Sequence, residues 1–85
     1  MNIIITGASK GIGYDTALKL AKSQENKVLA LSRDASKLKE LAAQSNNIEY
    51  LSFDITSPEI DALLQKVEAM GGVDILLNNA GLLIN

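Results

Sequence analysis

The chain has 85 residues, a formal net charge of −2, and neither cysteine nor histidine. Its length allows one small domain, and its composition excludes disulfides, thiolate metal sites and catalysis by cysteine or histidine. Because it has no basic cluster and no apolar run near the roughly 20 residues that span a bilayer, we expect a soluble, cytoplasmic protein that binds neither nucleic acid nor membrane.

The first third of the chain predicts a strand, a glycine-rich turn, a helix and a second strand. Residues 2–6 (NIIIT) and 27–32 (KVLALS) are continuous apolar runs, typical of strands buried on both faces. Between them, the apolar spacing becomes helical from Gly11 onward. The inner face of this helix is expected to carry Ile12, Thr16, Ala17, Leu20 and Ala21.

The rest of the chain continues the alternation of strands and helices. Asp34 is expected to cap a second helix, with Leu38, Leu41 and Ala42 on its inner face. Residues 48–53 alternate polar with apolar positions, which favours a strand at the edge of a sheet. Ser57 and Pro58 then predict the start of a third helix. Its apolar positions are Ile60, Leu63, Leu64 and Val67, and residues 73–77 (VDILL) predict a fourth strand.

The order β-α-β-α-β-α-β predicts an α/β fold, a partial Rossmann-type doubly wound parallel sheet with strand order 3-2-1-4. Ligands bind such sheets in the crevice between the carboxyl ends of the first and fourth strands. The glycines of residues 7–13 lie there, and they let the backbone approach a pyrophosphate without Cβ clashes. The helix that follows directs free N–H groups and its positive dipole end toward the anion.

Three motifs resemble those of the short-chain dehydrogenase/reductase family. TGASKGIG at residues 6–13 is similar to the family's glycine motif, and NNAG at residues 78–81 follows the fourth strand as in the family. Asp54 follows the third strand, where the family places an aspartate near the adenine. The resemblance covers the whole chain. It implies an NAD(P)-dependent oxidoreductase that transfers hydride between a nicotinamide and a carbonyl or alcohol.

The resemblance also implies roles for individual residues. Asp54 would accept a hydrogen bond from the adenine amino group, with the Ile55 backbone beside the ring, although Asp54 could instead cap a helix. The Ile12 backbone would donate to the pyrophosphate. Asn79 is as well explained by a structural tie between strands as by ligand contact. The expected cofactor-binding residues are Gly7, Ser9, Lys10, Gly11, Ile12, Gly13, Ser32, Arg33, Asp54, Ile55, Asn78, Asn79, Ala80 and Gly81.

The end of the second strand favours NADP over NAD. An NAD site needs a carboxylate there to bind the ribose hydroxyls, but the chain has Ser32 followed by Arg33. Both can bind a phosphate, and Lys10 adds a cation nearby. In the alternative interpretation Arg33 and Lys10 are solvated surface charges. Asp34 could be the ribose carboxylate, although a helix cap is the preferred role.

The family's catalytic Tyr-x-x-x-Lys pattern does not occur in these 85 residues, and we assign no catalytic residue. We therefore expect an N-terminal NAD(P)-binding half without the catalytic part, inactive by itself. The alternative is a non-catalytic nucleotide-binding or self-associating interaction module. An unpaired apolar fourth strand, or the tail that follows it, predicts a homo-oligomer.

Overall fold

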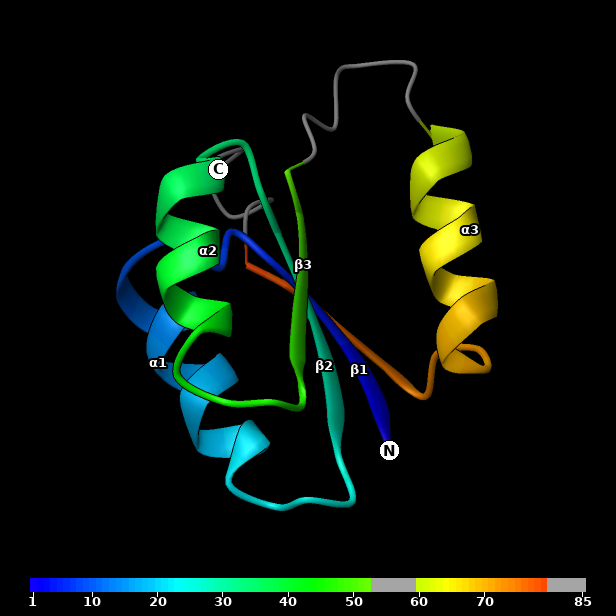
Figure 1. The fold of residues 1–85 in the computed structure, drawn as a ribbon, viewed down its shortest axis with the longest axis horizontal. Coiled ribbons are helices and arrows are strands. Elements are labelled where there is room, and N and C mark those ends of the chain that lie inside the picture. The colour runs from blue at the N-terminus through cyan, green and yellow to red at the C-terminus, as the bar shows by residue number, and fades with distance from the viewer. Residues whose placement is uncertain (53–59, 80–85) are drawn as a thin grey trace.

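The computed structural model describes residues 1–52 and 60–79. Its elements are β1 (Asn2–Thr6), α1 (Gly11–Ala21), β2 (Lys27–Ser32), α2 (Ala35–Ala42), β3 (Ile48–Ser52), α3 (Ile60–Met70) and β4 (Ile75–Asn78). The strands form one parallel sheet in the order β3-β2-β1-β4. Helices α1 and α2 lie on one side of the sheet and α3 on the other (Figure 1). The predicted fold class and strand order are confirmed.

Both faces of the central strands are buried, as their continuous apolar sequences predict. Toward α1 and α2 the buried residues are Ile3, Ile5, Ala8, Ala17, Ala21, Val28, Ala30, Leu38, Leu41 and Ile48. Toward α3 they are Ile4, Leu29 and Leu31, against which Leu51, Leu63, Val67 and Met70 pack. Alternate residues of β1 and β2 therefore belong to two separate apolar layers, and this requires a helix on each face.

The prediction that Ile12 faces the core is wrong, since its side chain is 76% exposed. The buried residues of α1 are Gly13, Ala17 and Ala21, which follow one another at a spacing of four. A residue one position away on a helix is rotated by about 100° from such a row. At Gly13 the start of α1 lies against the turn that follows β1, where a Cβ would lie 2.5 Å from the Gly7 carbonyl oxygen and has no room.

Two further expectations are corrected on the α3 side of the sheet. Leu64 is 54% exposed, and the helix packs through Leu63, Val67 and Met70 instead. Strand β4 begins at Ile75 rather than at residue 73, and Val73 is 40% exposed. The predicted start of the third helix at residues 57–58 lies outside the described residues.

The Asn47 side chain ties the connection before β3 to the connection between α1 and β2, at the amino end of the sheet. Its Nδ2 donates to the carbonyl oxygens of Ala21 at 2.9 Å, Ser23 at 3.2 Å and Asn26 at 2.9 Å. Ser45 Oγ donates to its Oδ1. The Ala21 carbonyl is the last of α1 and lacks a partner within that helix, so this amide satisfies a group that would otherwise need water.

None of the helices in the described ranges is long and apolar enough to cross a bilayer.

Candidate functional site

The carboxyl ends of β1 and β4 lie side by side. The two strands pair in parallel from Ile3↔Ile75 to Thr6↔Asn78. The chain leaves β1 toward α1 on one face of the sheet, while α3, which leads into β4, lies on the other face (Figure 1). This divergence is the topological switch point at which ligands bind open α/β sheets. The glycine-rich turn of residues 7–13 follows β1 at this point.

The glycines of this turn are required for two different reasons. Gly7 and Gly11 adopt φ values of 65° and 62°, a left-handed conformation that side chains disfavour. Gly13 instead provides close approach, because a Cβ there would lie 2.5 Å from the Gly7 carbonyl oxygen and 2.8 Å from Asn79 Nδ2. The first turn of α1 is therefore held directly against the peptide that follows β1.

The last residue of β4 and the residue after it are hydrogen-bonded to the end of β1 and to the glycine turn. Asn79 Nδ2 donates to the Gly7 carbonyl at 3.4 Å, and Thr6 Oγ1 donates to Asn78 Oδ1 at 2.9 Å. These bonds join the ends of two strands that are more than 70 residues apart in the sequence. The structural role considered for Asn79 is confirmed, and whether it also contacts a ligand stays a prediction.

A pair of serines joins the glycine turn to the end of β2. Ser32 Oγ donates to Ser9 Oγ at 2.8 Å, and the Asp34 backbone N–H donates to Ser32 Oγ at 3.2 Å. Sequence analysis selected both serines but missed the bond between them. Their positions at the carboxyl ends of neighbouring parallel strands were the available signal, since such strand ends meet at one edge of the sheet.

The two candidate phosphate-binding cations follow these serines directly. Lys10 comes after Ser9, and Arg33 comes after Ser32. Both are exposed, and neither forms an ion pair with another described residue; the one ion pair in those ranges joins Lys66 and Glu49 at 3.1 Å. Two cationic residues without a described ion-pair partner are thus adjacent in the chain to the two hydrogen-bonded serines.

Asp34 begins α2. Its Oδ1 accepts a hydrogen bond from the Lys37 backbone N–H at 3.1 Å. The predicted capping role is confirmed, and a side chain used in this way favours the cap over the ribose-binding alternative.

Several predicted site residues cannot be placed. Asp54, Ile55, Ala80 and Gly81 lie outside the described residues. Ile12, in the first turn of α1, is exposed at the glycine turn. No group of three or more acidic side chains in the described ranges is arranged to hold a metal ion.

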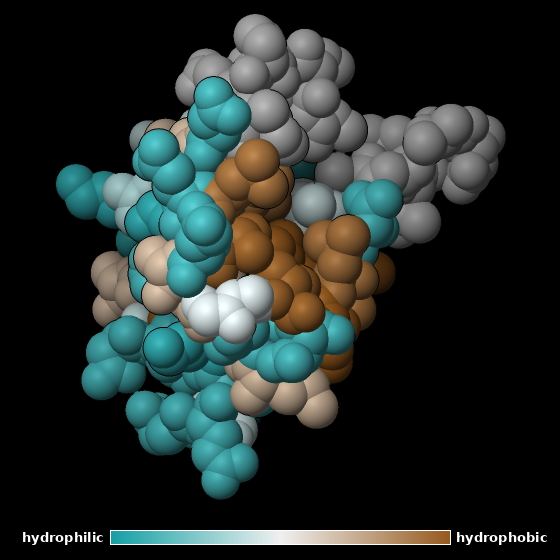
Figure 2. Space-filling model, turned by 90° about the vertical axis from the view of Figure 1, so that its right-hand side faces the viewer, coloured by the Kyte–Doolittle hydropathy of each residue, from teal (hydrophilic) through white to brown (hydrophobic). Residues whose placement is uncertain are grey.

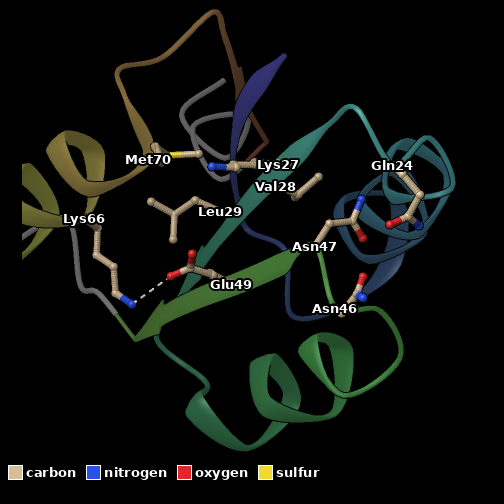
Figure 3. A pocket seen from close by; sticks show the side chains of 9 residues that line it. All are labelled: Gln24, Lys27, Val28, Leu29, Asn46, Asn47, Glu49, Lys66 and Met70. Carbon is tan, nitrogen blue, oxygen red and sulfur yellow. Dashed lines mark hydrogen bonds and ion pairs between the residues drawn. The ribbon is translucent and has the colours of Figure 1, made fainter.

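A small hollow of about 170 Å³ lies elsewhere, at the opposite end of the sheet (Figure 3). It is lined by Gln24, Lys27, Val28, Leu29, Asn46, Asn47, Glu49, Lys66 and Met70. Lys27, Val28 and Leu29 are the first residues of β2, so the hollow is remote from the carboxyl ends of the strands. Since ligands of doubly wound sheets bind at those carboxyl ends, we assign the hollow no part in the candidate site.

Comparison with known proteins agrees with the fold and the motifs. The family profile described as short chain dehydrogenase matches residues 1–85, and the chain belongs to that family. An uncharacterized oxidoreductase of Staphylococcus haemolyticus is 46% identical over 84 residues, covering 94% of this chain and 36% of the relative. A serine 3-dehydrogenase of Agrobacterium fabrum is 39% identical over 83 residues, covering 94% of this chain and 33% of the relative.

Solved structures give the same result. The L-sorbose reductase of Gluconobacter frateurii, complexed with NADPH and L-sorbose, matches with a TM-score of 0.78 and 33% identity over 94% of this chain and 33% of that one. An actinorhodin polyketide ketoreductase with NADPH has a TM-score of 0.81 and 32% identity over 92% of this chain and 32% of that one. The chain thus spans about a third of the length of these proteins.

Proposed function

We propose that this chain is the NADP(H)-binding part of a short-chain oxidoreductase that transfers hydride between the cofactor and a carbonyl or alcohol. The bond between Ser9 and Ser32 carries the proposal, because it joins the glycine turn to the end of β2, and Lys10 and Arg33 directly follow these two serines in the chain. When bound, the dinucleotide would supply the hydride acceptor or donor. The chain's own residues would hold the adenosine half.

The glycine turn fits a pyrophosphate. Gly7 and Gly11 have the conformation of a tight turn, and a Cβ at Gly11 would meet nothing within 4 Å, which leaves the backbone open to a ligand. Helix α1 begins at Gly11 without a hydrogen bond from a capping side chain. No side chain therefore competes with an anion for the N–H groups at the positive end of the helix dipole. We assign the pyrophosphate to this turn and to the backbone of Ile12.

The serine pair favours a 2′-phosphate over a free ribose diol. One hydroxyl proton is used between Ser32 and Ser9, and the Asp34 N–H already donates to Ser32 Oγ. The pair therefore has one hydroxyl proton left for a ligand, which suits a phosphate because its oxygens are acceptors. Arg33 and Lys10 would add charge-assisted hydrogen bonds. The similar ketoreductase and L-sorbose reductase structures both contain NADPH, which supports the same cofactor.

Other residues enter the proposal with less support from contacts. Asn78 and Asn79 would line the adenosine ribose, since they lie at the end of β4 beside the glycine turn. Asp54, Ile55, Ala80 and Gly81 are included on the family resemblance alone.

Replacing Arg33 with alanine is expected to weaken NADPH binding about tenfold to a hundredfold, because a hydrogen bond to a charged group contributes about 1.5–3 kcal/mol. NADH binding should change little, since NADH has no 2′-phosphate. Titration of the 85-residue chain with NADPH and with NADH, with the heat of binding recorded by calorimetry, measures both affinities.

The matched control is Lys39→Ala, which removes an exposed positive charge from α2, away from the serine pair. It should leave the ratio of the two affinities unchanged. Equal losses for NADPH and NADH in Arg33→Ala would contradict the 2′-phosphate assignment. Failure of the unmodified chain to bind either dinucleotide would contradict the proposal that these residues form the adenosine half-site by themselves.

We also propose that the 85 residues have no hydride-transfer activity alone, because the family's Tyr-x-x-x-Lys pattern does not occur in them. Oxidation of NADPH by the chain with a panel of aldehydes and ketones should remain at the background rate. Turnover above background would overturn this proposal.

A further inference from the structure

The peptide unit between Arg33 and Asp34 is hydrogen-bonded at both of its polar groups. Its N–H, which belongs to Asp34, donates to Ser32 Oγ at 3.2 Å. Its carbonyl oxygen, which belongs to Arg33, accepts a hydrogen bond from Ser52 Oγ, also at 3.2 Å. Because a peptide unit is planar, two bonds at its opposite edges fix its orientation. Two serines therefore restrict rotation about the Cα–C bond of Arg33.

Ser52 reaches the Arg33 carbonyl because it ends β3 directly opposite the end of β2. The two strands pair in parallel, and Ser52 is the register partner of Ser32. Alternate residues of a strand lie on the same face of the sheet. Since Tyr50 packs in the layer toward α1 and α2, Ser52 lies on that face as well. The chain that leaves β2 for α2 passes the end of β3 here.

The backbone on either side of Arg33 is also fixed. Ser32 is the last residue of β2, and its hydroxyl donates to Ser9 of the glycine turn at 2.8 Å. Asp34 is the N-cap of α2, and its side chain accepts a hydrogen bond within the first turn of that helix. Arg33 thus lies between a strand end and a helix cap, and the direction of its Cα–Cβ bond follows from the orientation of the peptide that Ser52 holds.

We propose that Ser52 is a positioning residue for Arg33, and that it sets the preference for the 2′-phosphate of NADP(H) by this route. The inference rests on the proposed function, in which Arg33 binds that phosphate. An exposed arginine loses much conformational freedom on binding, and a backbone that is fixed beforehand reduces this loss. Ser52 donates its one hydroxyl proton to the carbonyl, so it has none left for the phosphate itself.

A substitution at Ser52 disturbs little else in the described ranges. Its side chain is exposed, and the hydrogen bond that it forms there is the one to Arg33. Figure 2 shows apolar residues gathered on the α3 side of the molecule, whereas Ser52 lies on the other face of the sheet. Larger side chains can therefore replace Ser52 without a loss of packing.

The test compares Ser52→Thr with Ser52→Val, because threonine and valine have similar shapes and only threonine keeps the hydroxyl. Calorimetry measures the affinity of each variant for NADPH and for NADH, and circular dichroism shows that both fold. Ser52→Thr should keep the ratio of the two affinities found in the unmodified chain. Ser52→Val should lower this ratio about threefold to tenfold, the usual effect of losing one neutral hydrogen bond, with NADH affinity unchanged.

The double variant Arg33→Ala/Ser52→Val separates positioning from direct contact with the phosphate. Because Ser52 acts through Arg33, Ser52→Val should not lower the ratio further once Arg33 is replaced. A further loss would overturn the inference. So would equal ratios in Ser52→Thr and Ser52→Val where Arg33→Ala alone still lowers the ratio. An unchanged ratio in Arg33→Ala would instead contradict the proposed function, and with it any cofactor role of Ser52.

A measurement without cofactor tests the hold on the peptide itself. Loss of the bond to the Arg33 carbonyl frees the whole peptide unit, so the Asp34 amide hydrogen should exchange faster with solvent in Ser52→Val than in Ser52→Thr. Nuclear magnetic resonance resolves the exchange of this single amide. Equal exchange in the two variants would overturn the inference whatever the dinucleotide affinities are.

Discussion

Replacing Gly13 with alanine is expected to lower the free energy of unfolding by about 3 kcal/mol, near the upper end of the usual cost of overpacking. The added Cβ would lie 2.5 Å from the Gly7 carbonyl oxygen and 2.8 Å from Asn79 Nδ2. The carbonyl belongs to the backbone and cannot rotate away, so α1 must move from the turn. Urea denaturation followed by circular dichroism measures the change.

The same substitution should abolish dinucleotide binding, because the turn and the start of α1 would no longer be in register.

For the loss of stability, Gly11→Ala is the control. A Cβ at Gly11 would meet nothing within 4 Å, but the residue has a φ of 62°, so only backbone strain of about 1 kcal/mol is added. Equal losses of stability in the two variants would mean that strain, rather than close approach, explains the glycine at position 13.

The second large effect is expected for Asn47→Asp, which should also cost about 3 kcal/mol of stability. The amide nitrogen donates to three carbonyl oxygens, those of Ala21, Ser23 and Asn26. A carboxylate would remove the donor and place a negative oxygen against the same carbonyls, which leaves polar groups without partners at a half-buried position. A domain of this size has a total stability of only about 5–10 kcal/mol, so the midpoint of urea denaturation should fall markedly.

Asn46→Asp makes the same change of charge one residue away. Asn46 is exposed, and its substitution should change the stability by less than about 0.5 kcal/mol. If Asn46→Asp were as destabilising as Asn47→Asp, the cause would be the added negative charge and not the lost donor. Neither position belongs to the candidate cofactor site, so dinucleotide affinity should be unchanged wherever the variant remains folded.

Much of the fold follows from local sequence. Strands β1 and β2 have the predicted bounds, Asn2–Thr6 and Lys27–Ser32, because each is an uninterrupted apolar run closed by a turn or polar residues. Asp34 caps α2 as expected, since its side chain reaches a backbone N–H three residues later. The strand order follows from the alternation of strands and helices, which leaves few topologies for a chain with right-handed crossovers.

The candidate site was determined only in part by sequence. The glycine turn and the two cationic residues could be proposed directly from the sequence. A turn that approaches an anion needs residues without Cβ atoms and nearby positive charge. The hydrogen bonds from Ser32 to Ser9 and from Asn79 to Gly7 could not be predicted from the sequence, since each joins residues far apart in the chain. Such bonds depend on which strand ends become neighbours.

Thus the sequence alone determined a parallel α/β sheet with a glycine-rich turn at its switch point, because hydrophobic period, glycine placement and helix capping act over a few residues. Only the tertiary structure decided that Gly13 rather than Ile12 is buried, that Asn47 ties the connection before β3 to the one before β2, and that Ser32 bonds to Ser9. These features depend on the space and the partners that distant segments provide, and no local pattern encodes them.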